Sequence, residues 1–357
     1  MMVSLFQFAR LLWLFFACSI TCHAFEFGSL PKFNNPFDSI ISGNNSPGST
    51  ALNPGDTVAV VGASGNVGKL VALRLSDTYK VHGITRNPSS VSPFFEGREN
   101  SNQQQQQEVK LFQCDLLKET EETSASACPM SLVPALQNAN ALVICTGTTA
   151  FPTKAWSRSG DATVTGDVLK ALVDTKFSIK DAIASLDELG LNTPTNVDDR
   201  ANAFLLNAWN SVCKVRQKRV IMLSSIGVQR RDAMPFPILN ACGVLDAKAA
   251  GEESIQKAAA TGGYSYTIIR PGQLFGGPYD NNYYLGTLFQ LDKDADTQDV
   301  EVGRGDELLG DTLRSTLAEV TAQICEGDYA RDMDFACVNV KGESPSVETV
   351  QEKLKVL

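Results

Sequence analysis

Hydrophobic residues along the chain fall into two kinds of segment. Short continuous apolar runs rich in Val and Ile are typical of strands buried on both faces of a parallel sheet. Longer stretches that repeat apolar residues every three or four positions are typical of helices that bury one face. These patterns predict about seven strands, at residues 58–61, 79–85, 109–114, 141–145, 219–223, 266–270 and 335–340, and helices at 67–75, 168–189, 201–212, 313–325 and 346–357.

The alternation of these strands and helices predicts the fold class. Parallel neighbours in a sheet need a crossover connection, which is usually a helix. We therefore predict an α/β fold with a doubly wound parallel sheet and flanking helices. This single domain would occupy residues 56–357.

The first predicted strand is followed by three glycines at a spacing of three, Gly62, Gly65 and Gly68, and then by a helical pattern. A strand, a glycine-rich turn and a helix in this order are what a dinucleotide fingerprint requires. The first glycine permits the sharp turn, the second lets a pyrophosphate approach the backbone, and the third lets the helix pack on the strand. The turn therefore predicts a nucleotide site, with a merely structural turn as the alternative.

The second predicted strand ends in Arg86, Asn87 and Pro88. A site that prefers NAD would place a carboxylate near this point to hold the ribose hydroxyls. Arg86 instead offers a guanidinium suited to a 2′-phosphate, so the predicted cofactor is NADP rather than NAD. The alternative is an exposed arginine at a strand end.

The first 24 residues predict a targeting signal. Arg10 precedes an apolar run of about a dozen residues that ends in small residues at Ala24, too short to span a bilayer and typical of a signal peptide. Phe25 and the Ser, Asn, Pro and Gly-rich residues up to 55 resemble the second part of a bipartite plastid presequence of algae. We expect plastid (chloroplast) localisation and no transmembrane segment in the mature chain, with the secretory pathway as the alternative.

Composition and charge narrow the possible partners. The 357 residues are 43% hydrophobic and 20% charged, as in soluble globular proteins. Removing residues 1–24 removes only Arg10, so 30 basic residues would face 40 acidic ones, a net charge of −10. Such a chain is a poor electrostatic partner for nucleic acid or anionic lipid.

Cysteine and histidine usage argues against a metal site. Outside the predicted signal the chain has one histidine, His82, which excludes a histidine-based zinc site or a Ser-His-Asp triad. An odd number of scattered cysteines suggests buried reduced thiols and fits a reducing stroma better than a secretory lumen. These cysteines are Cys114, Cys128, Cys145, Cys213, Cys242, Cys325 and Cys337.

Several motifs along the chain point to one family. They are GASGNVG at 62–68, CDL at 114–116, TGTTAFP at 146–152, LSSIGV at 223–228 and YTIIRPGQL at 266–274. Together and in this order they resemble the atypical short-chain dehydrogenase/reductase family, which has a Rossmann fold, and most closely its NmrA-like, NAD(P)-binding plastid branch of plants and algae. The resemblance covers roughly residues 55–340.

The resemblance implies roles for the matching positions. The pyrophosphate would lie against the glycine turn, the 2′-phosphate at Arg86, the adenine near Asp115 and Leu116, and the cofactor ribose along Thr146 and Gly147. For Asp115 a helix cap is an equal alternative. The turn residues are Gly62, Ser64, Gly65, Asn66, Val67 and Gly68.

Two segments look like insertions. Residues 97–108 include five consecutive glutamines and predict a flexible polar loop. Residues 157–191 separate motifs that lie close together in related sequences. The second insertion could form a substrate lid, a partner surface or a neutral excursion.

The catalytic residues are only partly present. In the wider family, proton transfer uses a serine, a tyrosine and a lysine that lies four residues after the tyrosine. Ser225, or its neighbour Ser224, and Lys248 match the serine and the lysine, but the tyrosine position is Val244. Lys248 would still bind the nicotinamide ribose, and its alternative is a surface lysine paired with Glu252.

A missing tyrosine leaves three possibilities. Tyr279, Tyr283 or Tyr284 could serve as the acid, the hydride could go to a flavin or quinone, or the protein could bind NADP without turning it over. Two functions follow: an NADPH-dependent oxidoreductase with an unknown small-molecule substrate, or a non-catalytic NADP-sensing or assembly protein with a protein partner.

Overall fold

The computed structural model describes residues 49–96, 108–122, 128–276 and 297–357. The predicted signal peptide, most of the presequence, the glutamine-rich loop and Tyr279, Tyr283 and Tyr284 lie outside these residues. Ser49–Leu357 forms one compact unit. Within the described residues, no helix has both the length and the apolar character needed to cross a bilayer.

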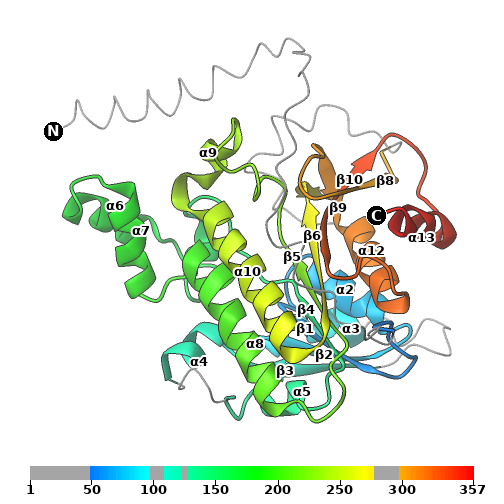
Figure 1. The fold of residues 1–357 in the computed structure, drawn as a ribbon. Helices are drawn as coiled ribbons and strands as arrows, with labels where there is room; N and C mark the ends of the chain where they lie inside the picture. The colour runs from blue at the N-terminus through cyan, green and yellow to red at the C-terminus, as the bar shows by residue number, and fades with distance from the viewer. Residues whose placement is uncertain (1–48, 97–107, 123–127, 277–296) are drawn as a thin grey trace. The chain divides into compact units, whose positions relative to one another are not determined.

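One mostly parallel sheet organises this unit (Figure 1). The strand order is β3-β2-β1-β4-β5-β6-β10-β9-β7, and β8 pairs with β10. All pairs from β3 to β10 are parallel, in the doubly wound order 3-2-1-4-5-6. The described strands are β1 (Thr57–Val61), β2 (Lys80–Thr85), β3 (Val109–Gln113), β4 (Ala141–Ile144), β5 (Arg219–Leu223), β6 (Ser265–Pro271), β7 (Gln273–Phe275), β8 (Asp299–Arg304), β9 (Asp311–Leu313) and β10 (Met333–Val340).

The predicted fold class is confirmed, but the predicted number of strands was too small. The structure describes ten strands in one sheet. The three missed strands follow β6 in the chain. β7 and β9 are each three residues long, and β8 reads DVEVGR with one fully buried residue, so none has the long apolar run that marks a buried strand.

Helices cover both faces of the sheet. The period of two along β1 sends Val58 and Val60 into one core and Ala59 and Val61 into the other. The first core packs against α2, α12 and α13, and the second against α8 and α10. The described α-helices are α2 (Gly68–Leu75), α3 (Ser92–Glu96), α4 (Leu116–Glu122), α5 (Val133–Leu136), α6 (Thr165–Asp174), α7 (Ile179–Glu188), α8 (Ala201–Val212), α9 (Phe236–Leu239), α10 (Val244–Gly262), α12 (Arg314–Glu326) and α13 (Val347–Lys355).

The second predicted insertion is a helical hairpin. The stretch predicted as one helix over 168–189 is two helices, α6 and α7. The break comes at Lys176 and Phe177, whose φ angles of 54° and 67° are left-handed and cannot continue a helix. The hairpin has a small core of its own, built from Trp156, Val164, Ala171, Ala182 and Leu186. Figure 1 shows it standing beyond α8 and α10, away from the sheet.

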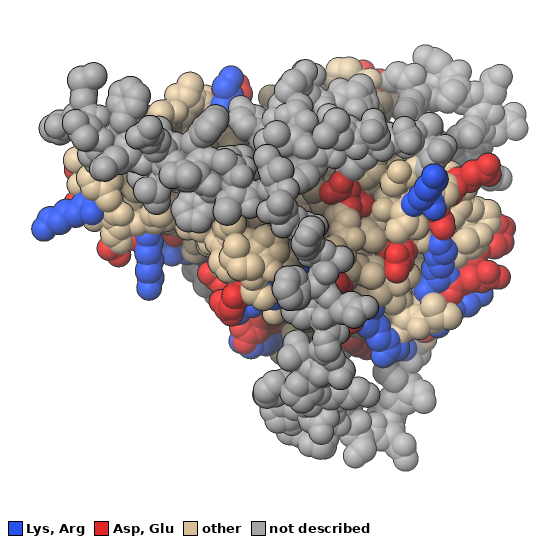
Figure 2. Space-filling model, turned by 90° about the horizontal axis from the view of Figure 1, so that it is seen from above, with Lys and Arg blue, Asp and Glu red and all other residues tan. Residues whose placement is uncertain are grey.

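Charges of both signs mix on the surface. On the coloured part of the face in Figure 2, Lys and Arg side chains lie among Asp and Glu side chains without a broad area of positive charge. Proteins that bind nucleic acid through the phosphate backbone usually carry such an area. This face therefore offers no broad cationic surface to nucleic acid.

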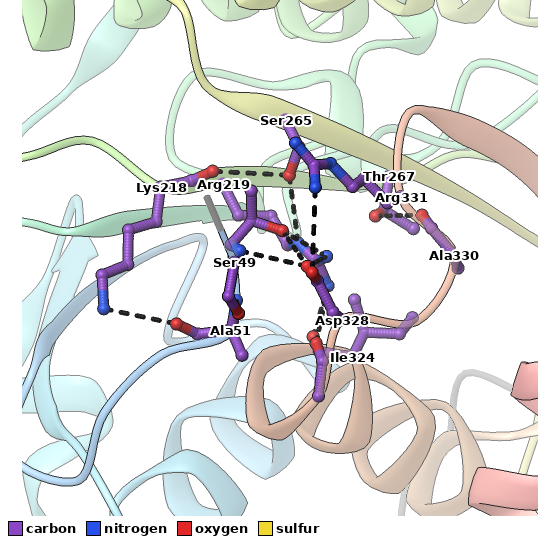
Figure 3. Close-up of polar contacts among 12 residues, drawn as sticks. Ser49, Ala51, Lys218, Arg219, Ser265, Thr267, Ile324, Asp328, Ala330 and Arg331 are labelled. Carbon is purple, nitrogen blue, oxygen red and sulfur yellow. Dashed lines mark hydrogen bonds and ion pairs between the residues drawn. The ribbon is translucent and has the colours of Figure 1, made fainter. Parts of the chain in front are cut away.

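The compact unit begins before the predicted boundary at residue 56, because Arg219 binds the segment that precedes β1 (Figure 3). Arg219 is fully buried and donates to Thr50 Oγ1 at 2.8 Å, to Ser265 Oγ at 3.3 Å and to the carbonyl of Ile324. Thr50 Oγ1 in turn donates to Asp328 Oδ1 at 2.6 Å. Thr50 thus joins the guanidinium to the end of α12.

The backbone and an apolar side chain of the same segment add to this contact. The Leu52 N–H donates to the Cys325 carbonyl at 2.9 Å, and the Leu52 side chain is buried in the first core. Lys218 binds both the Ala51 carbonyl and Asp56. Residues 49–55 are therefore part of the folded unit.

We expect a chain that begins at Asp56 to be less stable than one that begins at Ser49. The shorter chain exposes the site of Leu52 and leaves the buried Arg219 without Thr50, a loss of about 2–4 kcal/mol. Urea unfolding of the two chains measures the difference. Equal free energies of unfolding would show that residues 49–55 add nothing to the fold.

Candidate functional site

A cavity of about 280 Å³ lies at the carboxyl ends of β1 to β4. This edge is where an open α/β sheet forms its ligand crevice. Much of the predicted nucleotide site lines it, namely Gly62, Ser64, Gly65, Arg86, Asp115, Leu116, Thr146 and Gly147. Four separate loops thus bring their predicted residues to one cavity.

The glycine turn is closely packed. Gly62 has a φ of 80°, and a Cβ there would lie 3.1 Å from the Thr146 backbone nitrogen. Gly68 begins α2, and a Cβ there would lie 2.1 Å from the Gly62 carbonyl oxygen. Glycine at these two positions lets β1, α2 and the end of β4 approach one another.

This arrangement fits a pyrophosphate. The first turn of α2 holds no acidic residue, so nothing there neutralises the positive end of the helix dipole. Val67 is buried at the N-cap, Asn66 is half-buried between it and Gly65, and neither lines the cavity. Ser64 Oγ accepts a hydrogen bond of 2.7 Å from Thr85 Oγ1, which joins the turn to the end of β2.

Arg86 lies at the far end of the cavity. Its side chain is exposed, and Nη1 donates to the carbonyl of Arg158, at the start of the second insertion. Gly160, with a φ of 85°, leaves room for the guanidinium, since a Cβ there would lie 3.2 Å from Arg86 Nη2. A cation placed here fits a phosphate better than it fits two ribose hydroxyls.

Asp115 does more than line the cavity. Its Oδ1 accepts from the Leu117 backbone N–H at 3.2 Å, so Asp115 caps α4 as the alternative interpretation held. Its Oδ2 lies 3.5 Å from Arg158 Nη2. Leu116 beside it is buried and adds an apolar wall. The insertion thus contacts both Arg86 and Asp115.

Lys248 is not the surface lysine of the alternative interpretation. It is buried, and its Nζ lies 2.8 Å from Oδ1 of the fully buried Asp198. Glu252 instead binds Arg270 through both oxygens, at 3.0 and 2.6 Å. A Cβ at Gly147 would lie 3.4 Å from both Lys248 Nζ and Asp198 Oδ1, so the pair lies directly behind the cavity wall.

Asp198 is a site residue that the sequence analysis missed. It lies in a π-helical segment, Thr195–Arg200, and its Oδ2 also accepts from the Thr148 backbone N–H at 3.3 Å. Each oxygen of this buried carboxylate therefore has a donor. The sequence around it, NVDDR, reads as an exposed helix start and gave no signal of burial.

The two serines after β5 differ. Ser224 is buried and donates to Glu252 at 2.5 Å, so it belongs to the Glu252–Arg270 network. Ser225 is half-buried and donates to the Ile226 carbonyl at 3.1 Å. Neither serine nor Lys248 lines the cavity itself.

Val244, at the position where the family has its tyrosine, is an apolar residue with apolar neighbours. Val244 is the first residue of α10 and is 5% exposed. It packs in a cluster with Val228, Phe236 and Leu245. No proton donor can act from this position.

Burial holds the Cys114 thiol at the cavity and the His82 ring on β2 in their neutral forms. Burial raises the pKa of the Cys114 thiol to about 12, so it is no nucleophile at neutral pH. Burial lowers the pKa of His82, whose Nδ1 lies 2.9 Å from the Ala135 carbonyl. In the described part of the chain, no three His, Cys, Asp or Glu side chains gather as a metal would require.

The comparisons with known proteins agree with this geometry. A family model described as NAD(P)H-binding matches residues 62–326. No curated protein matches the chain.

Solved structures show the same fold at low identity. One is a Bacillus halodurans protein provisionally assigned as an NAD-dependent epimerase/dehydratase, at 17% identity and a TM-score of 0.52 over 85% of this chain and 100% of that one. Another is L-sorbose reductase from Gluconobacter frateurii, solved with NADPH and L-sorbose. It shares 12% identity and has a TM-score of 0.50 over 83% of this chain and 98% of that one. A third is 3-oxoacyl-[acyl-carrier protein] reductase from Brucella melitensis. It shares 12% identity and has a TM-score of 0.50 over 79% of this chain and 89% of that one.

We expect Gly68→Ala to destabilise the protein and weaken dinucleotide binding together. The new methyl group would overlap the Gly62 carbonyl and force β1 and α2 apart, at a cost of about 1–3 kcal/mol. Thermal unfolding and NADPH titration measure the two effects.

Gly166→Ala is the matched control for this variant. Gly166 lies on α6 with nothing within 4 Å of the added Cβ, so the change should leave stability equal or slightly higher. If Gly68→Ala behaved like Gly166→Ala, the close packing of the turn would be refuted.

Proposed function

The chain belongs to the NAD(P)H-binding family, and from this membership we propose that it binds NADP(H) in the cavity at the glycine turn and acts as an oxidoreductase without the usual tyrosine. It is an NAD(P)-binding protein with the Rossmann fold of the short-chain dehydrogenases/reductases. Its motifs place it, in this proposal, in the atypical, NmrA-like branch.

The preference for NADP is supported by Arg86, which follows the end of β2. Arg86 lines the cavity directly after β2, where an NAD site would hold a carboxylate, and the neighbouring positions Thr85 and Asn87 are uncharged. One nitrogen of the Arg86 guanidinium donates to the Arg158 carbonyl. A guanidinium has donors on three nitrogens, so others remain to bind a phosphate.

Lys248 and Ser225 are the proposed reaction-side residues. The bound nicotinamide would supply or accept a hydride. Lys248 lies behind Gly147, where its ammonium would bind a ribose hydroxyl of the cofactor, and its hydrogen bond to Asp198 orients it. Ser225 would hold a substrate oxygen at the end of β5.

The apolar position of Val244 supports one class of acceptor. A carbonyl substrate needs a proton donor of tuned pKa beside it as hydride arrives. A flavin or quinone places its charge on a delocalised ring and can take its proton from water. We therefore propose a flavin-like or quinone-like acceptor.

The N-terminal sequence, which lies outside the described residues, supports a proposal for where in the cell the protein is located. We propose that residues 1–24 are a signal peptide and that the following segment directs the protein to a plastid. The support is the short apolar run and the phenylalanine after Ala24. The alternative is the secretory pathway.

A second function, a non-catalytic NADP sensor, is favoured by one contact. Arg86 reaches both the cavity and the Arg158 carbonyl at the root of the α6–α7 hairpin. A phosphate that drew the guanidinium toward itself would alter this contact. Cofactor occupancy would then change a surface far from the nicotinamide.

We expect Arg86→Gln to reduce affinity for NADPH by about 10-fold to 100-fold, since it removes a charge-assisted contact to phosphate. NADH lacks the 2′-phosphate, so its affinity should stay unchanged and serves as the internal control. Calorimetric titration of both dinucleotides measures the ratio. An unchanged NADPH affinity would remove Arg86 from the site.

The function itself is tested by following NADPH absorbance with flavins, quinones and aldehydes. We expect oxidation with a flavin or quinone, none with aldehydes, and a clear loss in Lys248→Met. Asp198→Asn should lower the same rate, because it removes the negative charge that orients the ammonium of Lys248. Tight NADPH binding without oxidation by any acceptor would favour the sensor instead.

A further inference from the structure

The two ends of the second insertion meet at the cavity. Ala155, Gly160 and Asn192, which lie at or beside these ends, all line it. We call residues 155–160 and 190–192 the hairpin root. The hairpin root therefore adds a further wall to the cavity, beside the four loops that carry the predicted site residues.

Asn192 joins the two strands of the hairpin root to each other. Its Nδ2 donates to the Ala155 carbonyl at 3.1 Å and also to the Ser157 carbonyl. Its backbone N–H donates to the Trp156 carbonyl at 2.7 Å. Trp156, which is buried in the core of the hairpin, donates from Nε1 to the Thr149 carbonyl at 3.0 Å. The hairpin root is thus fixed to the loop that follows β4.

Arg158 of the hairpin root contacts both charged residues of the cavity. Among the described residues that line the cavity, Arg86 and Asp115 are the charged ones. The Arg158 carbonyl accepts from Arg86, and Arg158 Nη2 lies 3.5 Å from Asp115 Oδ2. Arg158 Nη1 donates to the Gly190 carbonyl at 3.0 Å, which ties the guanidinium to the other end of the insertion. One residue therefore holds Arg86 through its backbone and Asp115 through its side chain.

The contact with Arg158 matters because Asp115 is a carboxylate in a cavity that fits phosphates. Like charges repel, so an unpaired carboxylate would oppose the binding of an anionic ligand. The Leu117 N–H holds Oδ1 of Asp115, and Arg158 holds Oδ2 and offsets its charge. The side chains of Arg158 and Asp115 are 33% and 31% exposed, so water screens the pair only in part.

We propose that the hairpin root is part of the dinucleotide site and that Arg158 is a positioning residue, which sets Asp115 and Arg86 at the adenosine end of the cofactor. This inference rests on the proposed function, because it requires a dinucleotide in this cavity. Side chains that hold a ligand need a second layer of contacts to fix their orientation. The second insertion then serves the cofactor, a role that is not among the three alternatives left open by the sequence.

The first test is calorimetric titration of Arg158→Gln in residues 49–357, which form one compact unit. Affinity for NADPH should fall by about threefold to tenfold, because Asp115 loses the cation that pairs with it. Affinity for NADH and for adenosine 2′,5′-bisphosphate should fall as well, since both contain the adenosine. Arg86→Gln differs, because it should spare NADH. Unchanged affinity of the folded Arg158→Gln variant for all three ligands would overturn the inference.

A double-mutant cycle tests whether Arg158 acts through Asp115. Asp115→Asn keeps a side-chain oxygen that can cap α4 and removes the charge. In this background Arg158→Gln should change NADPH affinity by less than about twofold, because the two substitutions remove the same interaction. An equal loss in both backgrounds would contradict the positioning role. Lys170→Gln is the matched control, since it removes an exposed positive charge from the same hairpin and should leave affinity unchanged.

A second measurement needs no variant and separates this inference from the proposed function. Bound NADPH should slow amide hydrogen exchange in residues 156–162 as well as in the glycine turn at residues 62–68. If NADPH slows exchange in residues 62–68 but not in residues 156–162, the inference is wrong and the proposed function stands. If NADPH does not bind and neither segment changes, both are wrong.

Discussion

The site depends on how closely three backbone segments approach one another at the end of β1. The Gly62 carbonyl lies where a Cβ of Gly68 would be, and Gly62 itself lies against the backbone that follows β4. This contact brings the N-terminus of α2 to the carboxyl end of β1, and no side chain at the N-cap position caps that helix. The three segments meet this closely because Gly62 and Gly68 have no Cβ.

The sheet makes this approach possible by burying both of its faces. Alternate residues of β1 enter two different cores, so a shift of the strand by one position would exchange the side chains that fill each core. At the opposite end, Arg219 joins the segment before β1 to β6 and to the end of α12. The position of the glycine turn is therefore fixed by packing along the whole strand.

Sequence reasoning succeeded where a single local pattern determines the structure. The seven longer strands, the glycine turn and the placement of Arg86 and Asp115 at one sheet edge follow from apolar runs and from the rule that parallel strands end together. It failed where long-range contacts decide. Asp198 looks like an exposed helix residue until Lys248, fifty positions away, binds it. Residues 49–55 look like a linker until Arg219 binds Thr50, and β7 and β9 are too short to carry a pattern.

The central claim is that this backbone turn, with one guanidinium beside it, holds a phosphorylated dinucleotide. Calorimetric titration of NADP⁺ and NAD⁺ into the folded protein tests it most directly. We predict binding of both, with NADP⁺ bound more tightly and with an advantage that falls as salt rises, since the added contact is between charges. Absence of heat with either dinucleotide, confirmed by the absence of any shift in unfolding temperature, would contradict the account.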